Sequence, residues 1–257
     1  MDSPGFDARY LIPLFTAVEE LRGEGAYRTL PEPESGSRLE QDDAPLGPYA
    51  GSILIRSSHG AGVAHVDALR RLILAGEVDP QSPWTLLRGA LENFATGVWL
   101  LGGKSPSERR RRALALWRED MRNRQQHEDD TGHTPTGEGQ TGNQRRAEIV
   151  QLAATVGISA GALSAPKANV LLEEAARHAG MDPTQVRASW RVASGFAHGR
   201  YWPNLRAAQP RAAFISRPGL HSVALVIDET QHRELAEHTH ALLTHLHQRY
   251  RTGSSHS

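Results

Sequence analysis

The chain contains no cysteine, and this absence excludes several classes of protein at once. Without thiols there is no disulfide framework, no thiolate-bound metal and no cysteine nucleophile. Long apolar runs are also missing, because no segment approaches the roughly 20 apolar residues that cross a bilayer. The N-terminal region lacks the basic start and apolar stretch of a signal peptide. We therefore expect a cytoplasmic protein that has no membrane partner.

Lysine is almost absent, since Lys104 and Lys167 are the only two in 257 residues. Nearly all positive charge is therefore arginine, a bias that fits a GC-rich bacterial genome. Lys and Arg together number 29, and Asp and Glu also number 29. The balanced charge provides no long-range field that would attract nucleic acid. Any polyanion must therefore bind at a local basic patch.

Apolar residues recur at spacings of three and four along most of the chain, which predicts amphipathic helices. Ser82-Pro83 and Asp182-Pro183 provide an N-cap followed by proline, a combination typical of helix starts. We expect a mainly α fold, an antiparallel helical bundle that forms a single domain over 1–257. The predicted helices span 6–22, 52–75, 83–101, 106–126, 144–156, 168–179, 184–198 and 229–250.

Two segments are rich in Pro, Gly and acidic residues and are predicted to be flexible: a linker at 25–51 and a loop at 127–142. A small β-hairpin is predicted at 205–228, before the last helix. Its strands would be 211–216 and 221–227, since both are apolar and a Pro-Gly turn separates them.

The most chemically suggestive feature is the sequence WRVASGFAHG at 190–199, which carries Arg191 and His198. A spacing of seven is nearly two helical turns, so both side chains lie on one helix face. A histidine can exchange a proton with a ribose hydroxyl at neutral pH. The arginine fork suits the oxygens of a phosphate whose charge grows in the transition state. The pair has the parts for metal-free RNA cleavage.

This Arg-x6-His spacing at the end of a core helix, preceded by an antiparallel helix pair, resembles the HEPN superfamily. The family includes RNases of toxin, CRISPR-associated and defence systems. The resemblance implies a homodimer in which two such motifs share one cleft, with Arg191 and His198 as catalytic residues. It also implies an acidic partner on a neighbouring helix, for which Glu92 is the candidate. Val192 stands where the family usually has a polar residue.

Other residues are candidates for contact with an RNA substrate. The arginine run at 109–112 lies where the helix dipole disfavours cations, so these side chains seek either solvent or a phosphate. The aromatics near the motif either stack on bases or belong to the core. Arg88 either contacts substrate or forms a salt bridge with Glu92 four residues on. The candidate substrate-binding residues are Arg88, Arg109, Arg110, Trp190 and Trp202.

No metal site and no cofactor are predicted. His59 and His65 lie six residues apart, which places them on different helix faces, and we interpret them as buried or lining residues. The last helix carries five histidines, of which His238 recurs seven residues later at His245 and His240 at His247. Pairs two turns apart are too far apart for one metal ion without other ligands, and a solvated face is the preferred interpretation. The sequence also lacks a phosphate-binding glycine loop after a strand and a Gly-x-Ser-x-Gly elbow.

Three functions remain open at this level. The leading hypothesis is a HEPN-like, metal-independent endoribonuclease or an RNA-binding relative, from a bacterial defence or toxin-type system. The first alternative is a non-catalytic helical protein whose 190–202 segment serves dimerisation. The second is a small-molecule-binding enzyme with a pocket among the helices near His59, His65 and Glu92.

Overall fold

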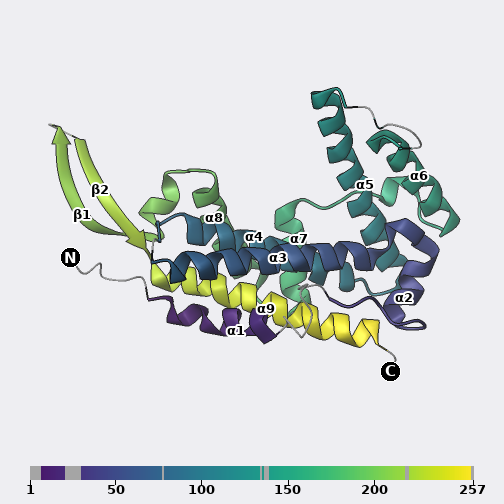
Figure 1. Cartoon of the computed structure of the whole chain (residues 1–257), viewed down its shortest axis with the longest axis horizontal. Helices are drawn as coiled ribbons and strands as arrows, with labels where there is room; N and C mark the ends of the chain where they lie inside the picture. Colours follow the sequence, from purple (N-terminus) through teal and green to yellow (C-terminus); the bar gives the residue numbers. More distant parts are fainter. Residues whose placement is uncertain are drawn as a thin grey trace.

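A computed structural model describes residues 7–20, 30–76, 78–133, 135, 139–217 and 220–255. It confirms the mainly helical class, with long helices aligned along one axis (Figure 1). The central helix is α4 (Ser82–Leu101), and 12 of its 20 residues are buried. A helix that is buried over most of its circumference needs several neighbours. Its main neighbours are α3 (Gly51–Leu74), α9 (Glu229–Ser254), α7 (Ala168–His178) and α8 (Pro183–Ala197).

The remaining elements surround this centre. The 3-10 turn η1 (Ala8–Leu11) and α1 (Ile12–Glu20) pack on α3 and α9. Helix α5 (Pro106–Thr131) projects from the bundle and packs against α6 (Gly142–Thr155), as Figure 1 shows. Two further 3-10 turns are η3 (Ala160–Ala162) and η4 (Trp202–Leu205). Strands β1 (Ala208–Arg217) and β2 (Leu220–Ile227) pair antiparallel, and the residues between them lie outside the described chain.

The predicted linker at 25–51 is wrong from residue 30 onward, whereas 25–29 lie outside the described residues. The chain there forms α2 (Arg38–Asp43) and the 3-10 turn η2 (Ala44–Tyr49). Three apolar side chains anchor these turns, since Leu39, Leu46 and Tyr49 are all buried. The polar composition of the segment gave no sign that these three apolar residues are buried. Their burial requires α5 and the end of α9 as partners.

The predicted loop at 127–142 begins later than expected. Helix α5 continues to Thr131 and ends at Gly132, whose φ of 65° is the left-handed conformation that glycine adopts readily. Glu128 ties the two helices of this arm together, because its Oε1 accepts from Arg124 Nε at 2.7 Å and its Oε2 accepts from Gly142 N at 2.9 Å. A residue that suggested a loop by composition is thus a buried cross-link between helices.

The contact between α3 and α4 depends on a glycine. A Cβ at Gly62 would collide with the rigid ring of Phe94, whereas a Cβ at Gly60, on the same helix, would meet open space. We predict that Gly62→Ala lowers the free energy of unfolding by about 1–3 kcal/mol through overpacking. Gly60→Ala should raise it by about 0.5–1 kcal/mol, because alanine favours the helix. Urea unfolding of both variants measures the difference, and equal effects would contradict the close approach.

Candidate functional site

Helix α8 carries Arg191, His198 is its C-cap residue, and both ends of the helix are well defined. The Asp182 side chain accepts from Thr184 N at 2.8 Å, with Pro183 in the first turn, as the sequence predicted. Gly199 ends the helix with φ 60°. The buried face of α8 carries residues such as Val186 and Phe196, and Phe196 stacks on Trp84 of α4. One face of α8 is thereby fixed to the core, and the other faces outward.

Arg191 and His198 are both exposed. The His198 backbone N–H donates to Ser194 O at 3.1 Å, but among the described residues its ring has no hydrogen-bond partner. The Arg191 guanidinium likewise has no acceptor within the described chain. Seven residues of helix separate the two by about 10 Å along the axis. They therefore do not touch each other, and only a ligand lying along the helix contacts both.

Glu92 takes a different role from the predicted one. Its Oε1 accepts from the indole N–H of Trp190 at 2.6 Å and lies 2.9 Å from Arg88 Nε. Three of the predicted site residues thus meet, but they bind one another, and no contact with Arg191 or His198 is present in the described chain. This network cross-links α4 to α8 and fixes the residue that precedes Arg191.

The turn after α8 carries an exposed apolar group, which we define as Tyr201, Trp202 and Leu205. Their exposed fractions are 74, 44 and 66%. The turn folds back tightly over α8, because a Cβ at Gly195 would lie 3.2 Å from the Trp202 ring. Trp202 therefore lies beside the motif, as predicted, and its ring is partly exposed to solvent.

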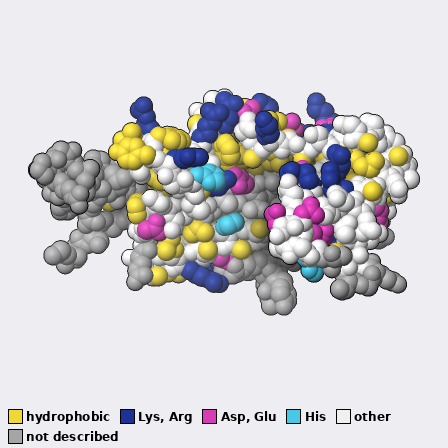
Figure 2. All heavy atoms as spheres, turned by 90° about the horizontal axis from the view of Figure 1, so that it is seen from above, with side chains coloured by type: hydrophobic (Ala, Val, Ile, Leu, Met, Phe, Trp, Pro, Cys, Tyr) yellow, Lys and Arg dark blue, Asp and Glu magenta, His cyan; other side chains and the backbone are white. Residues whose placement is uncertain are grey.

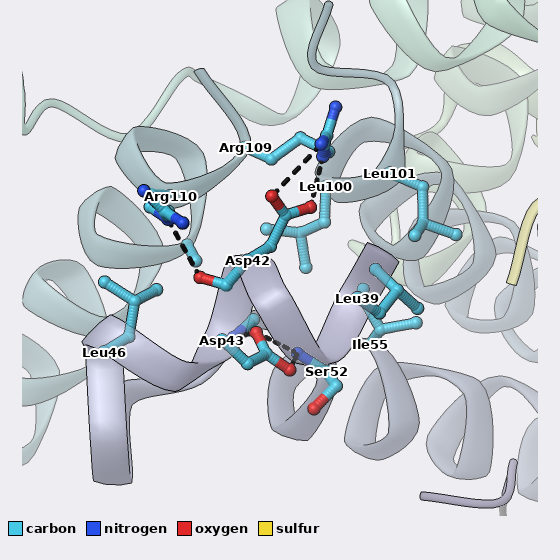
Figure 3. Close-up of a pocket in the computed structure, with 12 residues that line it drawn as sticks. Leu39, Asp42, Asp43, Leu46, Ser52, Ile55, Leu100, Leu101, Arg109 and Arg110 are labelled. Atoms are coloured by element: carbon cyan, nitrogen blue, oxygen red, sulfur yellow. Dashed lines mark hydrogen bonds and ion pairs between the residues drawn. The ribbon is translucent and has the colours of Figure 1, made fainter. Parts of the chain in front are cut away.

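The predicted RNA-contacting arginines of α5 are engaged within the chain. Arg109 holds Asp42 with two hydrogen bonds, Nε to Oδ2 at 2.5 Å and Nη2 to Oδ1 at 3.1 Å (Figure 3). Arg110 donates to the backbone oxygens of Asp42 at 3.1 Å and Gln41 at 2.9 Å. The side chains of Arg109 and Asp42 are only 11 and 8% exposed. The prediction that this run faces solvent or phosphate is wrong for Arg109, because α2 supplies buried carboxylate and carbonyl acceptors.

The neighbouring Arg112 is buried as well. It donates to Trp99 O at 2.6 Å and to Glu108 Oε1 at 2.7 Å, and its guanidinium lies over the Trp99 ring. A bond from the Lys104 backbone N–H, with help from Arg112, holds the pKa of the Glu108 carboxyl below its usual value. The arginine run therefore joins α5 to α4 and α2.

Arg109, Asp42 and Asp43 line one small cavity between α2, α3 and α5, as Figure 3 shows. Asp43 accepts from the first N–H groups of α3, at 2.7 Å from Gly51 N and 3.3 Å from Ser52 N. Burial raises the pKa of the Asp43 carboxyl despite these bonds. The cavity holds only about 20 Å³, room for roughly one water molecule. This is a structural junction and not a substrate pocket.

We predict that Arg109→Ala lowers the free energy of unfolding by about 3–5 kcal/mol, because it leaves the Asp42 carboxylate buried without its partner. The double variant Arg109→Met with Asp42→Leu should recover much of this loss, since it removes both charges. Urea unfolding measures both. A loss below about 1 kcal/mol for Arg109→Ala would contradict a structural role for the pair.

The histidines of α9 do not form a solvated face as predicted. His232 is fully buried against Trp84, and its Nδ1 lies 2.7 Å from the Tyr10 hydroxyl. His247 is half-buried and reaches across to α3, where its Nε2 lies 2.8 Å from His59 Nε2. The spacing of the histidines describes α9 alone. It gives no sign that α1, α3 and α4 cover this face of the helix. The prediction that His59 is buried is confirmed.

Burial governs the protonation of these histidines. It lowers the pKa of His232 from 6.5 to about 3. Burial, with the neighbouring His59 and Arg251, lowers the pKa of His247 to about 3 as well. The unfolded chain binds these protons near pH 6.5 and the folded chain only near pH 3. Acidification from pH 6.5 toward pH 3 therefore favours the unfolded chain.

We predict that the free energy of unfolding falls as the pH drops below 6.5, by up to about 1.4 kcal/mol per pH unit for His232 alone. His232→Gln should make this fall shallower, whatever its effect at pH 7.5. His127→Gln, at an exposed site on α5, serves as the control and should leave the slope unchanged. Denaturant unfolding at pH 7.5, 5.5 and 4.5 measures the slopes. Identical slopes for the wild type and His232→Gln would refute the assignment.

Within the described part of the chain, no group of three or more Asp, Glu or His side chains is arranged to hold a metal ion. In the same residues, no helix combines the length and apolar character needed to cross a bilayer. The comparisons with known proteins found no match among family models, curated proteins or solved structures. Any function is therefore argued from the side chains alone.

Proposed function

We propose that this chain is a HEPN-like, cytoplasmic RNA-binding protein that cleaves RNA without a metal ion at Arg191 and His198. One observation supports the proposal: Arg191 on α8 and His198 at its C-cap are both exposed, and neither side chain has a partner among the described residues. Most other arginines near the core bind acceptors within the chain. Leaving one arginine and one histidine open together favours a ligand that accepts hydrogen bonds from both.

The chemistry matches these two groups. A neutral His198 imidazole takes the proton of a ribose 2′-hydroxyl, and the 2′-oxygen attacks the adjacent phosphorus. The bond from phosphorus to the 5′-oxygen breaks, and the 5′-oxygen leaves with a proton from an acid. Arg191 neutralises the charge that grows on the phosphate oxygens. The products are a 2′,3′-cyclic phosphate and a 5′-hydroxyl end, and no metal takes part.

A second copy of the chain supplies the acid in this proposal, because one imidazole cannot give and take a proton in the same step. The exposed group Tyr201, Trp202 and Leu205 supports either a dimer contact or base stacking beside the motif. Glu92 acts as a positioning residue here, since its bond to Trp190 fixes the orientation of α8.

We predict that the purified protein cleaves single-stranded RNA in EDTA and that His198→Ala lowers the rate by about 100-fold or more. Arg191→Gln should cause a similar loss, because the phosphorane charge is no longer neutralised. Cleavage is followed on end-labelled RNA, with the 2′,3′-cyclic phosphate end identified by mass spectrometry.

The matched control is His127→Ala, an exposed histidine on α5, which should cleave as the wild type does. Cleavage that persists in His198→Ala, or that requires added Mg²⁺, would contradict the proposed chemistry.

The second candidate function is a non-catalytic helical protein that dimerises through the 201–205 turn. The exposed group Tyr201, Trp202 and Leu205 favours it, because large apolar side chains that gather on a surface often mark a protein contact. Sedimentation of the wild type and Trp202→Ser separates the candidates. A dimer that Trp202→Ser dissociates, in a protein that neither binds nor cleaves RNA, would favour this function over the first.

A further inference from the structure

A second basic site lies away from α8, in the angle between α5, α6 and the segment that leads into α7. Its hollow has a volume of about 270 Å³. Figure 2 shows dark-blue Lys and Arg side chains on this face of the molecule, toward the end where α5 and α6 lie. The residues that line it are Ala115, Arg118, Glu119, Arg122, Arg146, Leu163, Ser164, Ala165, Pro166 and Lys167.

The hollow is strongly cationic. Four basic side chains line it, and Glu119 is its one carboxylate. That carboxylate is already engaged, because Arg122 Nε donates to Glu119 Oε2 at 2.9 Å and Arg122 Nη2 donates to Oε1. Lys167 is exposed and has no acidic partner among the described residues. Arg118, Arg146 and Lys167 therefore leave positive charge that no described carboxylate neutralises.

Two of these arginines also carry unsatisfied donors. Arg118 is anchored by Nη1, which donates to Leu163 O at 2.9 Å, and Arg146 by Nη1, which donates to Asn143 Oδ1 at 3.2 Å. Their Nε atoms are buried and have no acceptor in the described chain. A buried donor without an acceptor costs about 1–3 kcal/mol. Guanidinium groups bind phosphate oxygens through two N–H groups at once, and the Nη2 groups of Arg118 and Arg146 donate to no acceptor in the described chain.

The first turn of α7 adds to the same field. Lys167 is the N-cap residue of this 11-residue helix, and no side chain caps its first N–H groups. The N-terminus of a helix carries partial positive charge and unpaired donors, which favour an anion. The helix end and the three basic side chains therefore favour the same kind of ligand.

We propose that this hollow binds a small phosphate monoester. A dianionic phosphate offers enough oxygens for several charged donors, whereas a carboxylate offers only two. The volume of the hollow limits the size of the ligand. Pockets for drug-sized ligands begin near 300 Å³, and this hollow is slightly smaller. It accommodates a phosphate with a small organic group and excludes the flanking nucleosides of an RNA chain. The site is independent of Arg191 and His198.

Calorimetric titration of the full chain with ribose 5-phosphate tests the proposal, with ribose as the uncharged control. Ribose 5-phosphate should bind at submillimolar concentration and ribose should not bind. Lys167→Gln and Arg146→Gln should each weaken binding by about tenfold, equivalent to about 1.4 kcal/mol. Lys104→Gln removes the only other lysine, which is exposed outside the hollow, and should bind as the wild type does.

Two results would overturn the proposal. The first is no binding at millimolar ribose 5-phosphate, or equal binding by the wild type and Lys167→Gln, whose exposed side chain can be replaced without unfolding the protein. The second is displacement of bound ribose 5-phosphate by a short single-stranded RNA without terminal phosphates, which would assign the hollow to nucleic acid. Loss of RNA cleavage in His198→Ala does not bear on either result, so this site and the RNase proposal fail separately.

Discussion

The burial of α4 over most of its circumference is the constraint on which the rest of the structure depends. Outside a polar stripe that includes Thr85, Arg88 and Glu92, this helix carries buried, mostly apolar residues, so it is stable only when several other helices pack around it. Trp84 illustrates the requirement, since it contacts Phe196 of α8 and His232 of α9 at once. Residues more than a hundred positions apart in sequence must therefore assemble around one helix before the core is dry.

The arginines connect the outer elements to this core. Arg109 and Arg110 hold α2, Arg112 holds the C-terminal end of α4, and Arg118 holds the segment before α7. Arginine suits this task because its planar fork reaches two acceptors at once and stays charged when partly buried. The composition suggested that the arginines of this chain lie at the surface. Several of them instead form structural cross-links between helices.

Local signals in the sequence were sufficient for the existence of the long helices and for some of their ends. The capping of α8 by Asp182 and Pro183, and its end at Gly199, follow from residues within a few positions of one another. The 30–50 segment could not be predicted in the same way, because Leu39 and Leu46 become core residues only when α5 and α9 lie beside them. The role of Glu92 was missed for the same reason. Its partner Trp190 is 98 residues away in sequence, and no pattern links them.

Most arginines bind acceptors within the described chain, so those without an acceptor are candidates for binding a ligand. In a chain this rich in arginine, an isolated Arg-x6-His spacing has little weight, since chance produces many such spacings. Arg109, Arg110 and Arg112 bind acceptors within the protein. Arg191 belongs to a smaller set of exposed arginines that have no side-chain acceptor in the described chain, with Arg71, Arg200, Arg206, Arg249 and Arg251. Two places combine such open cations with a further feature: Arg191 of α8 is followed by the exposed His198 at the helix C-cap, and Lys167 lines a hollow together with Arg118 and Arg146. Because the net charge is zero, neither draws on a general attraction for polyanions. Each must therefore bind its anion through local geometry: the open α8 face suits an extended chain of phosphates, and the 270 Å³ hollow suits a single small one.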